Sequence, residues 1–298
     1  MSMLNPTPGL LPFFLPASDG QRYCLLHLPA PGQAARGGIL YIHPFAEELN
    51  KSRHVAAMQA RAFAALGYSV LQLDLYGCGD SSGDFGDARW SIWRNDLHLA
   101  CAWLARRVDG PLTLWGLRLG ALLALDIAAH PPLPLARLLL WQPELDGRRV
   151  IDRFLRLRLA GRMLAHGGNA EAPGQARDDA RGELAAGRAV EVAGYLLAPE
   201  LARAIDTFDA ATVASALRPS VPVYWLESAS GDAPVRPAPA LKLATQWRNQ
   251  GTQLAIAGFG DGAFWNSAEL LECPQLLAAT RHLCRDWLDL PEGEPDER

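Results

Sequence analysis

Lysine is almost missing from this 298-residue chain, which has only Lys51 and Lys242 among its 28 basic residues. The remaining basic residues are arginines, and the formal net charge is −4, so the composition gives no case for nucleic-acid binding. The five cysteines are odd in number and form no C-x-x-C pair, which predicts neither a disulfide framework nor a zinc site. Free thiols fit a reducing compartment, and we expect neither a metal nor a cofactor.

Long apolar runs are also missing, since none approaches the ~18 residues that a membrane-spanning helix needs. The opening stretch MSMLNPTPGLLPFFLP has apolar patches but no basic start, and prolines interrupt it repeatedly. A signal peptide is therefore not expected. With 49% hydrophobic and 20% charged residues, the chain has the composition of a soluble globular protein, which we expect in the cytoplasm.

Short apolar strands alternate with helices along most of the chain. A hairpin signal at Ser18-Asp19-Gly20 joins the first two strands. Helices are expected at about 51–66, with Asn50 as N-cap, at 88–108, from the elbow to 130, and at 267–288. Strands are expected at 13–17, 22–28, 39–42, 69–74, 112–115, 137–141, 221–226 and 253–257. This alternation predicts an α/β fold with a mainly parallel central sheet flanked by helices.

The regular alternation stops between about 147 and 215, where a helical cap or lid is expected before the last two strands. We therefore divide the chain into a core of 1–146 with 216–298 and a cap of 147–215. The stretch HGGNAEAPGQARDDARGE within the cap is expected to be weakly structured. Residues 148–162 form an arginine-rich amphipathic helix, which can be a lid, a partner helix or a helix resting on anionic lipid.

The most informative stretch is LTLWGLRLGALLALDIAAH, residues 112–130. It has the strand–turn–helix layout of a nucleophile elbow, G-x-S-x-G, with small residues at Gly116 and Gly120. Arg118 stands where the serine belongs. A guanidinium remains protonated and cannot attack a carbonyl. The steric frame of the elbow is therefore kept without its nucleophile.

The partners of a catalytic serine are incomplete as well. A Ser-His-Asp triad needs an acid after the next-to-last strand, where Glu227 and Asp232 are the candidates; we place the acid position at Asp232. It also needs a histidine after the last strand, where Gly262 stands instead. Cys78 and His43 lie near strand ends, but a tight glycine-rich loop and a structural loop histidine are the favoured interpretations.

Residues 43–90, the elbow segment WGLRLGALLAL and the arginine-rich VIDRFLRLRLAGRM together resemble the exosortase A system-associated hydrolase 2 group. The resemblance spans most of residues 10–270. It implies an α/β-hydrolase fold and a setting of exopolysaccharide and PEP-CTERM protein export. In that group an arginine at the elbow is usual, so the departure is from the wider superfamily, which has Ser and His in place of Arg118 and about Gly262.

In the superfamily, the loop after the first parallel strand and the residue after the nucleophile supply oxyanion-hole amides. Carried over, these are the backbone N–H groups of Phe45 and Leu119. Together with Arg118 and a helix N-terminus, they predict an anion-binding pocket under a lid. The competing interpretation is that a carboxylate of the chain occupies Arg118, with candidates Glu47, Glu48, Asp80, Glu144 and Asp232. The wider set of candidate pocket residues is His43, Glu47, Glu48, Cys78, Asp80 and Trp265.

Two functions remain open. One is an ester, thioester or acyl hydrolase or acyltransferase with a non-standard nucleophile, or with a water held by Asp80, Asp232 or Glu47. The other is a non-catalytic descendant that binds a small anion or a partner, including membrane-associated export machinery through 148–162. The residues favour the second, and fold alone decides neither.

Overall fold

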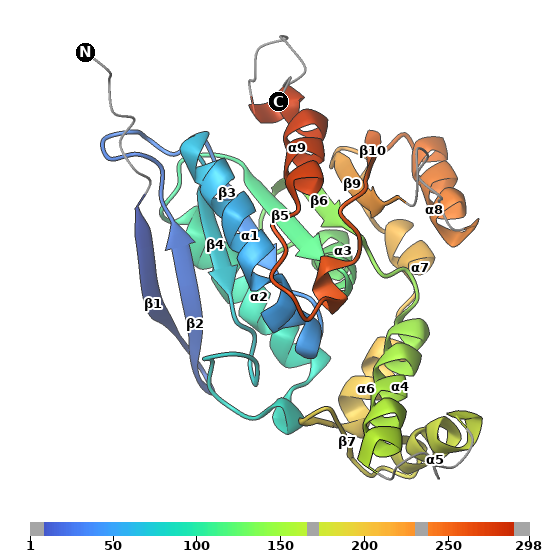
Figure 1. Cartoon of the computed structure of the whole chain (residues 1–298). Helices are drawn as coiled ribbons and strands as arrows, with labels where there is room; N and C mark the ends of the chain where they lie inside the picture. The colour runs from blue at the N-terminus through green and yellow to red at the C-terminus, as the bar shows by residue number, and fades with distance from the viewer. Residues whose placement is uncertain (1–8, 166–172, 230–237, 289–298) are drawn as a thin grey trace.

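An eight-stranded sheet forms the centre of the computed structural model, which describes residues 9–165, 173–229 and 238–288 (Figure 1). The strand order is β1-β2-β4-β3-β5-β6-β9-β10. β1, β2 and β4 pair antiparallel, and every later pair is parallel, which confirms the mainly parallel sheet with an antiparallel edge. The strands are β1 Leu10–Ala17, β2 Gly20–His27, β3 Gly38–Ile42, β4 Ser69–Leu73, β5 Leu112–Leu117, β6 Leu135–Trp141, β9 Val223–Ser228 and β10 Leu254–Phe259.

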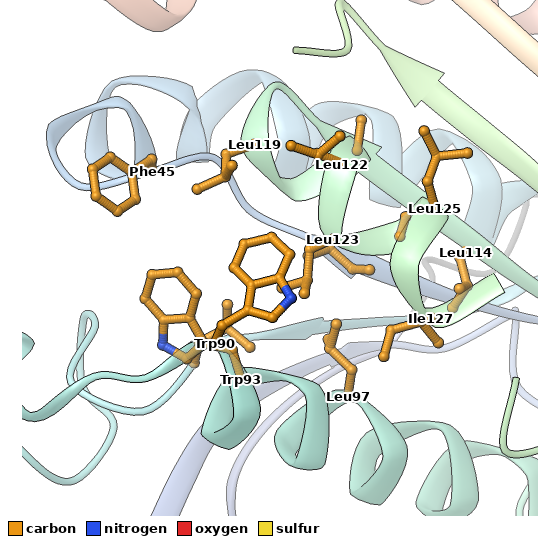
Figure 2. Close-up of a cluster of buried hydrophobic side chains, with 14 of the residues drawn as sticks. Phe45, Trp90, Trp93, Leu97, Leu114, Leu119, Leu122, Leu123, Leu125 and Ile127 are labelled. Carbon is orange, nitrogen blue, oxygen red and sulfur yellow. The ribbon is translucent and has the colours of Figure 1, made fainter. Parts of the chain in front are cut away.

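Helices cover both faces of the sheet, as continuous apolar strands require. One buried cluster joins α1, α9 and α10 to one face, and a second joins α2, α3 and α8 to the other. Figure 2 shows the α2–α3 side, where Trp93 and Leu97 of α2 meet Leu123 of α3. The bounds are α1 Glu47–Ala65, α2 Trp90–Ala105, α3 Leu119–Ala129, α8 Ala238–Asn249, α9 Pro274–Leu283 and α10 Arg285–Leu288, with short 3-10 turns η1 Phe85–Asp87 and η2 Phe264–Asn266.

The outer edge of β1 is protected by prolines. Leu28 N–H donates to the Gly9 carbonyl, and the hairpin register continues this alternation, so Pro12 and Pro16 have their nitrogens on the outer side. Proline cannot donate to a further strand, and charged or proline-bearing edges resist edge-to-edge pairing. The hairpin therefore ends the sheet.

A helical insertion lies between β6 and β9 and gathers at one end of the sheet in Figure 1. One guanidinium holds three of its helices together, because Arg181 of α5 pairs with Asp152 of α4 at 2.7 Å and with Asp206 of α6 at 2.5 Å. Among the helices of the described ranges, none has both the length and the apolar character to cross a membrane. The elements of the insertion are α4 Gly147–Ala165, α5 Pro173–Ala185, β7 Val190–Val192, β8 Tyr195–Leu197, α6 Pro199–Asp206 and α7 Ala210–Ala214.

Three boundary expectations are wrong. α1 begins at Glu47, with Ala46 rather than Asn50 as its N-cap residue, because an unusual backbone turn starts the helix directly after the β3 loop. The last helical region begins at Pro274, where a proline suits the first helical turn, and not at 267. The stretch expected to be weakly structured contains α5 from Pro173 onward.

Candidate functional site at the nucleophile elbow

The turn between β5 and α3 has the backbone of a nucleophile elbow. Arg118 precedes α3 with φ 58° and ψ −119°, a region that side-chain-bearing residues rarely adopt. A Cβ on Gly116 would lie 2.5 Å from the Cα of Ala121, and one on Gly120 only 2.2 Å from the Ile42 carbonyl oxygen. The two glycines are therefore required by space, and the strained turn presents a guanidinium.

The guanidinium of Arg118 is paired with carboxylates of the chain. Arg118 is 6% exposed, and its Nη2 contacts Glu48 Oε1 at 3.3 Å and Glu144 Oε1 more closely still. Arg153 of α4 reaches the same Glu144 oxygen at 2.5 Å. The Arg118 guanidinium also lies over the Trp265 ring, 4.8 Å from its centroid. In this structure Arg118 is therefore paired with carboxylates of the chain itself, which is the interpretation that competes with a free anion site.

Burial of Glu48 raises the pKa of its carboxyl, while the neighbouring Arg118 charge opposes that rise. The pKa of Glu47, which is half-buried one residue earlier, is raised for the same reason. Of the five carboxylates expected as partners of Arg118, Glu48 and Glu144 make the contact. Asp80 is exposed in the loop after β4, and Asp232 lies outside the described residues, as does the acid position assigned to it.

The two oxyanion-hole amides expected at Phe45 and Leu119 lie beside this ion-pair cluster. Both residues line a cavity of about 10 Å³ together with Glu48, Glu144 and others. Neither amide donates a hydrogen bond to another group within the described residues. A cavity of this size accepts about one water molecule. The cavity that Phe45 and Leu119 line is therefore too small for a substrate.

Two further triad positions, after β9 and after β10, lie partly within the described residues, where Glu227 and Gly262 stand. Glu227 ends β9, where its Oε1 accepts a 3.0 Å hydrogen bond from the Gln142 side chain, and burial raises its pKa. Gly262 follows β10 with φ 78°, and a Cβ there would meet nothing within 4 Å. Glycine supplies no base at this position, and its positive φ is one that other residues rarely adopt.

The other candidates for nucleophile and base, Cys78 and His43, have structural positions in the loops. His43 Nδ1 donates to the Pro44 carbonyl at 2.7 Å, and its Nε2 accepts from Leu75 N–H at 3.3 Å, so both ring nitrogens contact backbone. Burial lowers the pKa of His43. Cys78 is buried, and the pKa of its thiol is raised well above the usual range. Neither residue forms a nucleophile–base pair.

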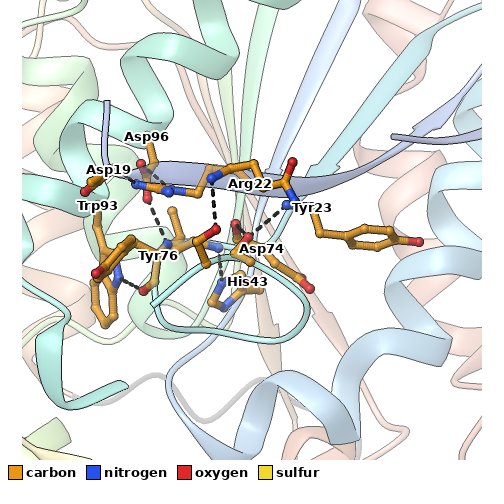
Figure 3. Close-up of polar contacts among 12 residues, drawn as sticks. Asp19, Arg22, Tyr23, His43, Asp74, Tyr76, Trp93 and Asp96 are labelled. Carbon is orange, nitrogen blue, oxygen red and sulfur yellow. Dashed lines mark hydrogen bonds and ion pairs between the residues drawn. The ribbon is translucent and has the colours of Figure 1, made fainter. Parts of the chain in front are cut away.

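Sequence reasoning missed a second buried polar network, at the hairpin side of the molecule (Figure 3). Arg22 is almost fully buried, with Nε 2.7 Å from Asp96 Oδ1 and Nη2 2.5 Å from Asp19 Oδ1. The second Asp96 oxygen accepts from Tyr76 N–H at 2.8 Å. The available signal was an arginine at the start of the strand expected at 22–28. The network joins the β1–β2 turn to the loop after β4.

Metal chemistry has no evident location, since no group of three or more His, Cys, Asp or Glu side chains could hold an ion within the part of the chain that the structure describes. The elbow between β5 and α3 presents Arg118, which Glu48 and Glu144 contact. Residues 33–256 match the family described as serine aminopeptidase, S33 (Hydrolase_4), so this chain belongs to that family of α/β hydrolases. No curated protein matches the chain.

Solved structures with the same fold include several esterases. Est1E from Butyrivibrio proteoclasticus, with ferulic acid bound, is 13% identical with a TM-score of 0.62, and the match covers 93% of this chain and all of that one. The Pyrococcus furiosus esterase PF2001 is 11% identical with a TM-score of 0.61, covering 97% and 98% of the two chains. A thioesterase domain from the curacin pathway is 19% identical with a TM-score of 0.53, covering 92% and 99%. At these identities the likeness shows the fold.

Proposed function

We propose that this chain is a non-catalytic α/β hydrolase that binds a small anionic molecule at its elbow. The observation that carries the proposal is Arg118 in the nucleophile position, whose buried Nε has no hydrogen-bond partner within the described residues while Glu48 and Glu144 contact its Nη2. An elbow that presents a guanidinium has no group to form an acyl intermediate, whereas a guanidinium and free amides are suited to carboxylate or phosphate.

The arginine-rich helix does not favour membrane contact as the main function. Arg149, Arg153 and Arg158 of α4 each pair with a carboxylate of the chain, at 3.5, 2.5 and 2.9 Å respectively. These pairs reduce the positive charge available to anionic lipid. We therefore propose that α4 serves as the lid of the elbow site, within a cap formed by residues 147–215.

The finer assignment is to the exosortase A system-associated hydrolase 2 group. Its support is the resemblance of residues 43–90, the arginine elbow and residues 150–163 to that group. This assignment predicts that the gene lies among genes for exopolysaccharide synthesis and protein export. We propose that the protein itself is located in the reducing interior of the producing cell. The genome sequence around the gene tests it directly.

The test of the catalytic question is turnover of a panel of p-nitrophenyl esters and acyl thioesters, from acetyl to decanoyl, by wild type and Arg118→Ala. Labelling by a fluorophosphonate probe gives a second readout. We expect no turnover above the buffer rate and no labelling for either protein. Turnover by the wild type that Arg118→Ala loses would establish an active hydrolase or acyltransferase in which Arg118 acts as an electrophile. Turnover retained by Arg118→Ala would place a nucleophile elsewhere, and either result overturns the proposal.

A further inference from the structure

Two side chains of α4 fill the space in front of the elbow. The Phe154 ring packs edge-on against Phe45 with centroids 5.0 Å apart, and Arg153 contacts Glu144. Together with Leu119 these residues leave the cavity of about 10 Å³ described above. In this closed form the site accepts about one water and no organic ligand.

The contacts of Glu144 indicate what kind of group the site prefers. Its Oε1 is shared by the guanidinium groups of Arg118 and Arg153. Two guanidinium groups directed at one carboxylate oxygen form a receptor for an anion, because Arg–carboxylate bonds are charge-assisted. The Nε of Arg118 is buried without a hydrogen-bond partner in the described structure, so donor capacity is still unused there. Glu48 contacts the same Nη2 of Arg118 and lines the same cavity, so Glu144 is one of two carboxylates that this pair of guanidinium groups binds.

Apolar walls continue from the same point. A second cavity of about 10 Å³ shares Phe45 and Leu119 with the first, and its lining includes Trp93 and Leu123, which Figure 2 shows beside them. Cys78 and Leu75 add to its apolar surface, and His43 also lines it. A ligand whose charged end replaces Glu144 would therefore find an apolar surface for its other end, where Phe154 now lies.

We propose that Glu144 and Phe154 are displaceable occupants of a site for an amphipathic carboxylate. Arg118 and Arg153 bind the carboxylate, and Phe45 with the apolar walls beyond it binds an alkyl or aryl tail. This inference rests on the proposed binding function and names its ligand class. No bond is made or broken, and the ligand exchanges with two side chains of the chain itself.

The exchange requires side-chain movement rather than removal of α4. Arg181 ties α4 to α5 and α6, and a Cβ on Gly147 at the start of α4 would lie 1.8 Å from the Ile205 carbonyl oxygen. The N-terminus of α4 is therefore closely packed against α6. Glu144 lies in the loop before α4 with its side chain 12% exposed, so its carboxylate can turn to water when a ligand replaces it.

The experiment measures octanoate binding by titration calorimetry to wild type, Glu144→Gln and Phe154→Ala. Removing the competing carboxylate should raise octanoate affinity by about tenfold or more in Glu144→Gln, since a neutral amide competes poorly for two guanidinium groups. Phe154→Ala should also bind more tightly, because its ring no longer fills the space for the tail. Arg153→Gln should lower the affinity of the Glu144→Gln background.

The matched control is Glu183→Gln, which removes the carboxylate paired with Arg158 of the same helix, away from the elbow. It should leave octanoate binding unchanged. Octan-1-ol and octylammonium, with the same tail and no negative charge, should not distinguish Glu144→Gln from wild type. Circular dichroism melting verifies that each variant folds, and the isosteric Glu144→Gln is the variant on which the test depends.

Octanoate affinity that is equal in wild type and Glu144→Gln would overturn the inference. An equal gain for octylammonium would also overturn it, by showing apolar exposure without anion recognition. Ester turnover by the wild type would instead overturn the proposed function, and the octanoate comparison would still report on the anion receptor. The two failures are therefore distinguishable.

Discussion

Ala46 and Arg118 share one rare backbone conformation, with φ 50° and ψ −121° in the first and φ 58° and ψ −119° in the second. Each follows one of two neighbouring parallel strands, β3 and β5, and each precedes a helix. The same turn therefore starts α1 and α3 side by side. Their first turns bring Glu48 of α1 to Arg118, which is the contact that defines the site.

This shared strain predicts the effect of glycine at Ala46. Strain at a rare backbone conformation costs roughly 1–3 kcal/mol, and glycine relieves it at the expense of unfolded-chain entropy and one buried methyl. We expect Ala46→Gly to stabilise the fold by about 1 kcal/mol, and Ala56→Gly, inside regular α1, to destabilise it by about 1 kcal/mol or more. Urea unfolding of both variants measures the difference, and similar losses in the two would contradict the strain at Ala46.

Removing the guanidinium of Arg118 should lower the free energy of unfolding, because its carboxylate partner Glu48 is buried. Arg118→Met leaves the buried carboxyl of Glu48 without its guanidinium and removes the contact with Glu144, and breaking a buried ion pair costs about 3–5 kcal/mol. The double variant Arg118→Met/Glu48→Gln should recover part of that loss. As a control, Arg149→Met breaks a pair with Asp146 in which both side chains are exposed, at 70% and 49%, and should cost about 1 kcal/mol or less. A double-mutant cycle without coupling between positions 48 and 118 would refute this account.

The elbow glycines should tolerate no side chain. Gly120→Ala would place a Cβ 2.2 Å from a backbone oxygen, and overpacking of this severity costs about 3 kcal/mol. The control is Gly182→Ala in the exposed part of α5, where a Cβ meets nothing within 4 Å and helix propensity should stabilise by up to about 1 kcal/mol. Thermal melting compares the two. A Gly120→Ala protein as stable as wild type would mean that the close approach to Ile42 can relax.

The Asp96 network predicts a pH dependence of stability. Burial raises the pKa of Asp96 from its ordinary 3.8 to about 6 in the folded protein. The folded state therefore holds a proton that the unfolded state has lost between these pH values, so this contribution to stability is present below about pH 4 and is lost as pH rises through about 6. The full shift corresponds to on the order of 3 kcal/mol.

Asp96→Asn removes the titration of this group. The other carboxyl groups whose pKa is raised by burial are present in both proteins. The free energy of unfolding of wild type minus that of Asp96→Asn should therefore fall as pH rises from about 4 to about 7. Urea unfolding at several pH values gives this difference. Parallel curves for the two proteins would show that Asp96 does not titrate in the window.

The order of strands and helices in the core was predictable from periodicity. Apolar strands such as Ile39–Ile42 and Leu112–Trp115 have no polar face, so they must be covered on both sides, and the connecting helices supply that cover. Boundaries were harder, because Ala46 begins a helix through a turn that carries no side-chain cap. Helix starts without a capping residue leave little trace in a single sequence.

What the sequence determined by itself is the steric frame of the elbow. Small residues at Gly116 and Gly120 frame the elbow position, where the chain has Arg118 and no serine. Five carboxylates were candidates to pair with Arg118. Only the tertiary structure shows that Glu48 and Glu144 are the ones that contact it. Ion pairing depends on where side chains of α1, the β6–α4 loop and α4 meet in space. Residues 70 positions apart meet there because the sheet places the starts of α1 and α3 side by side.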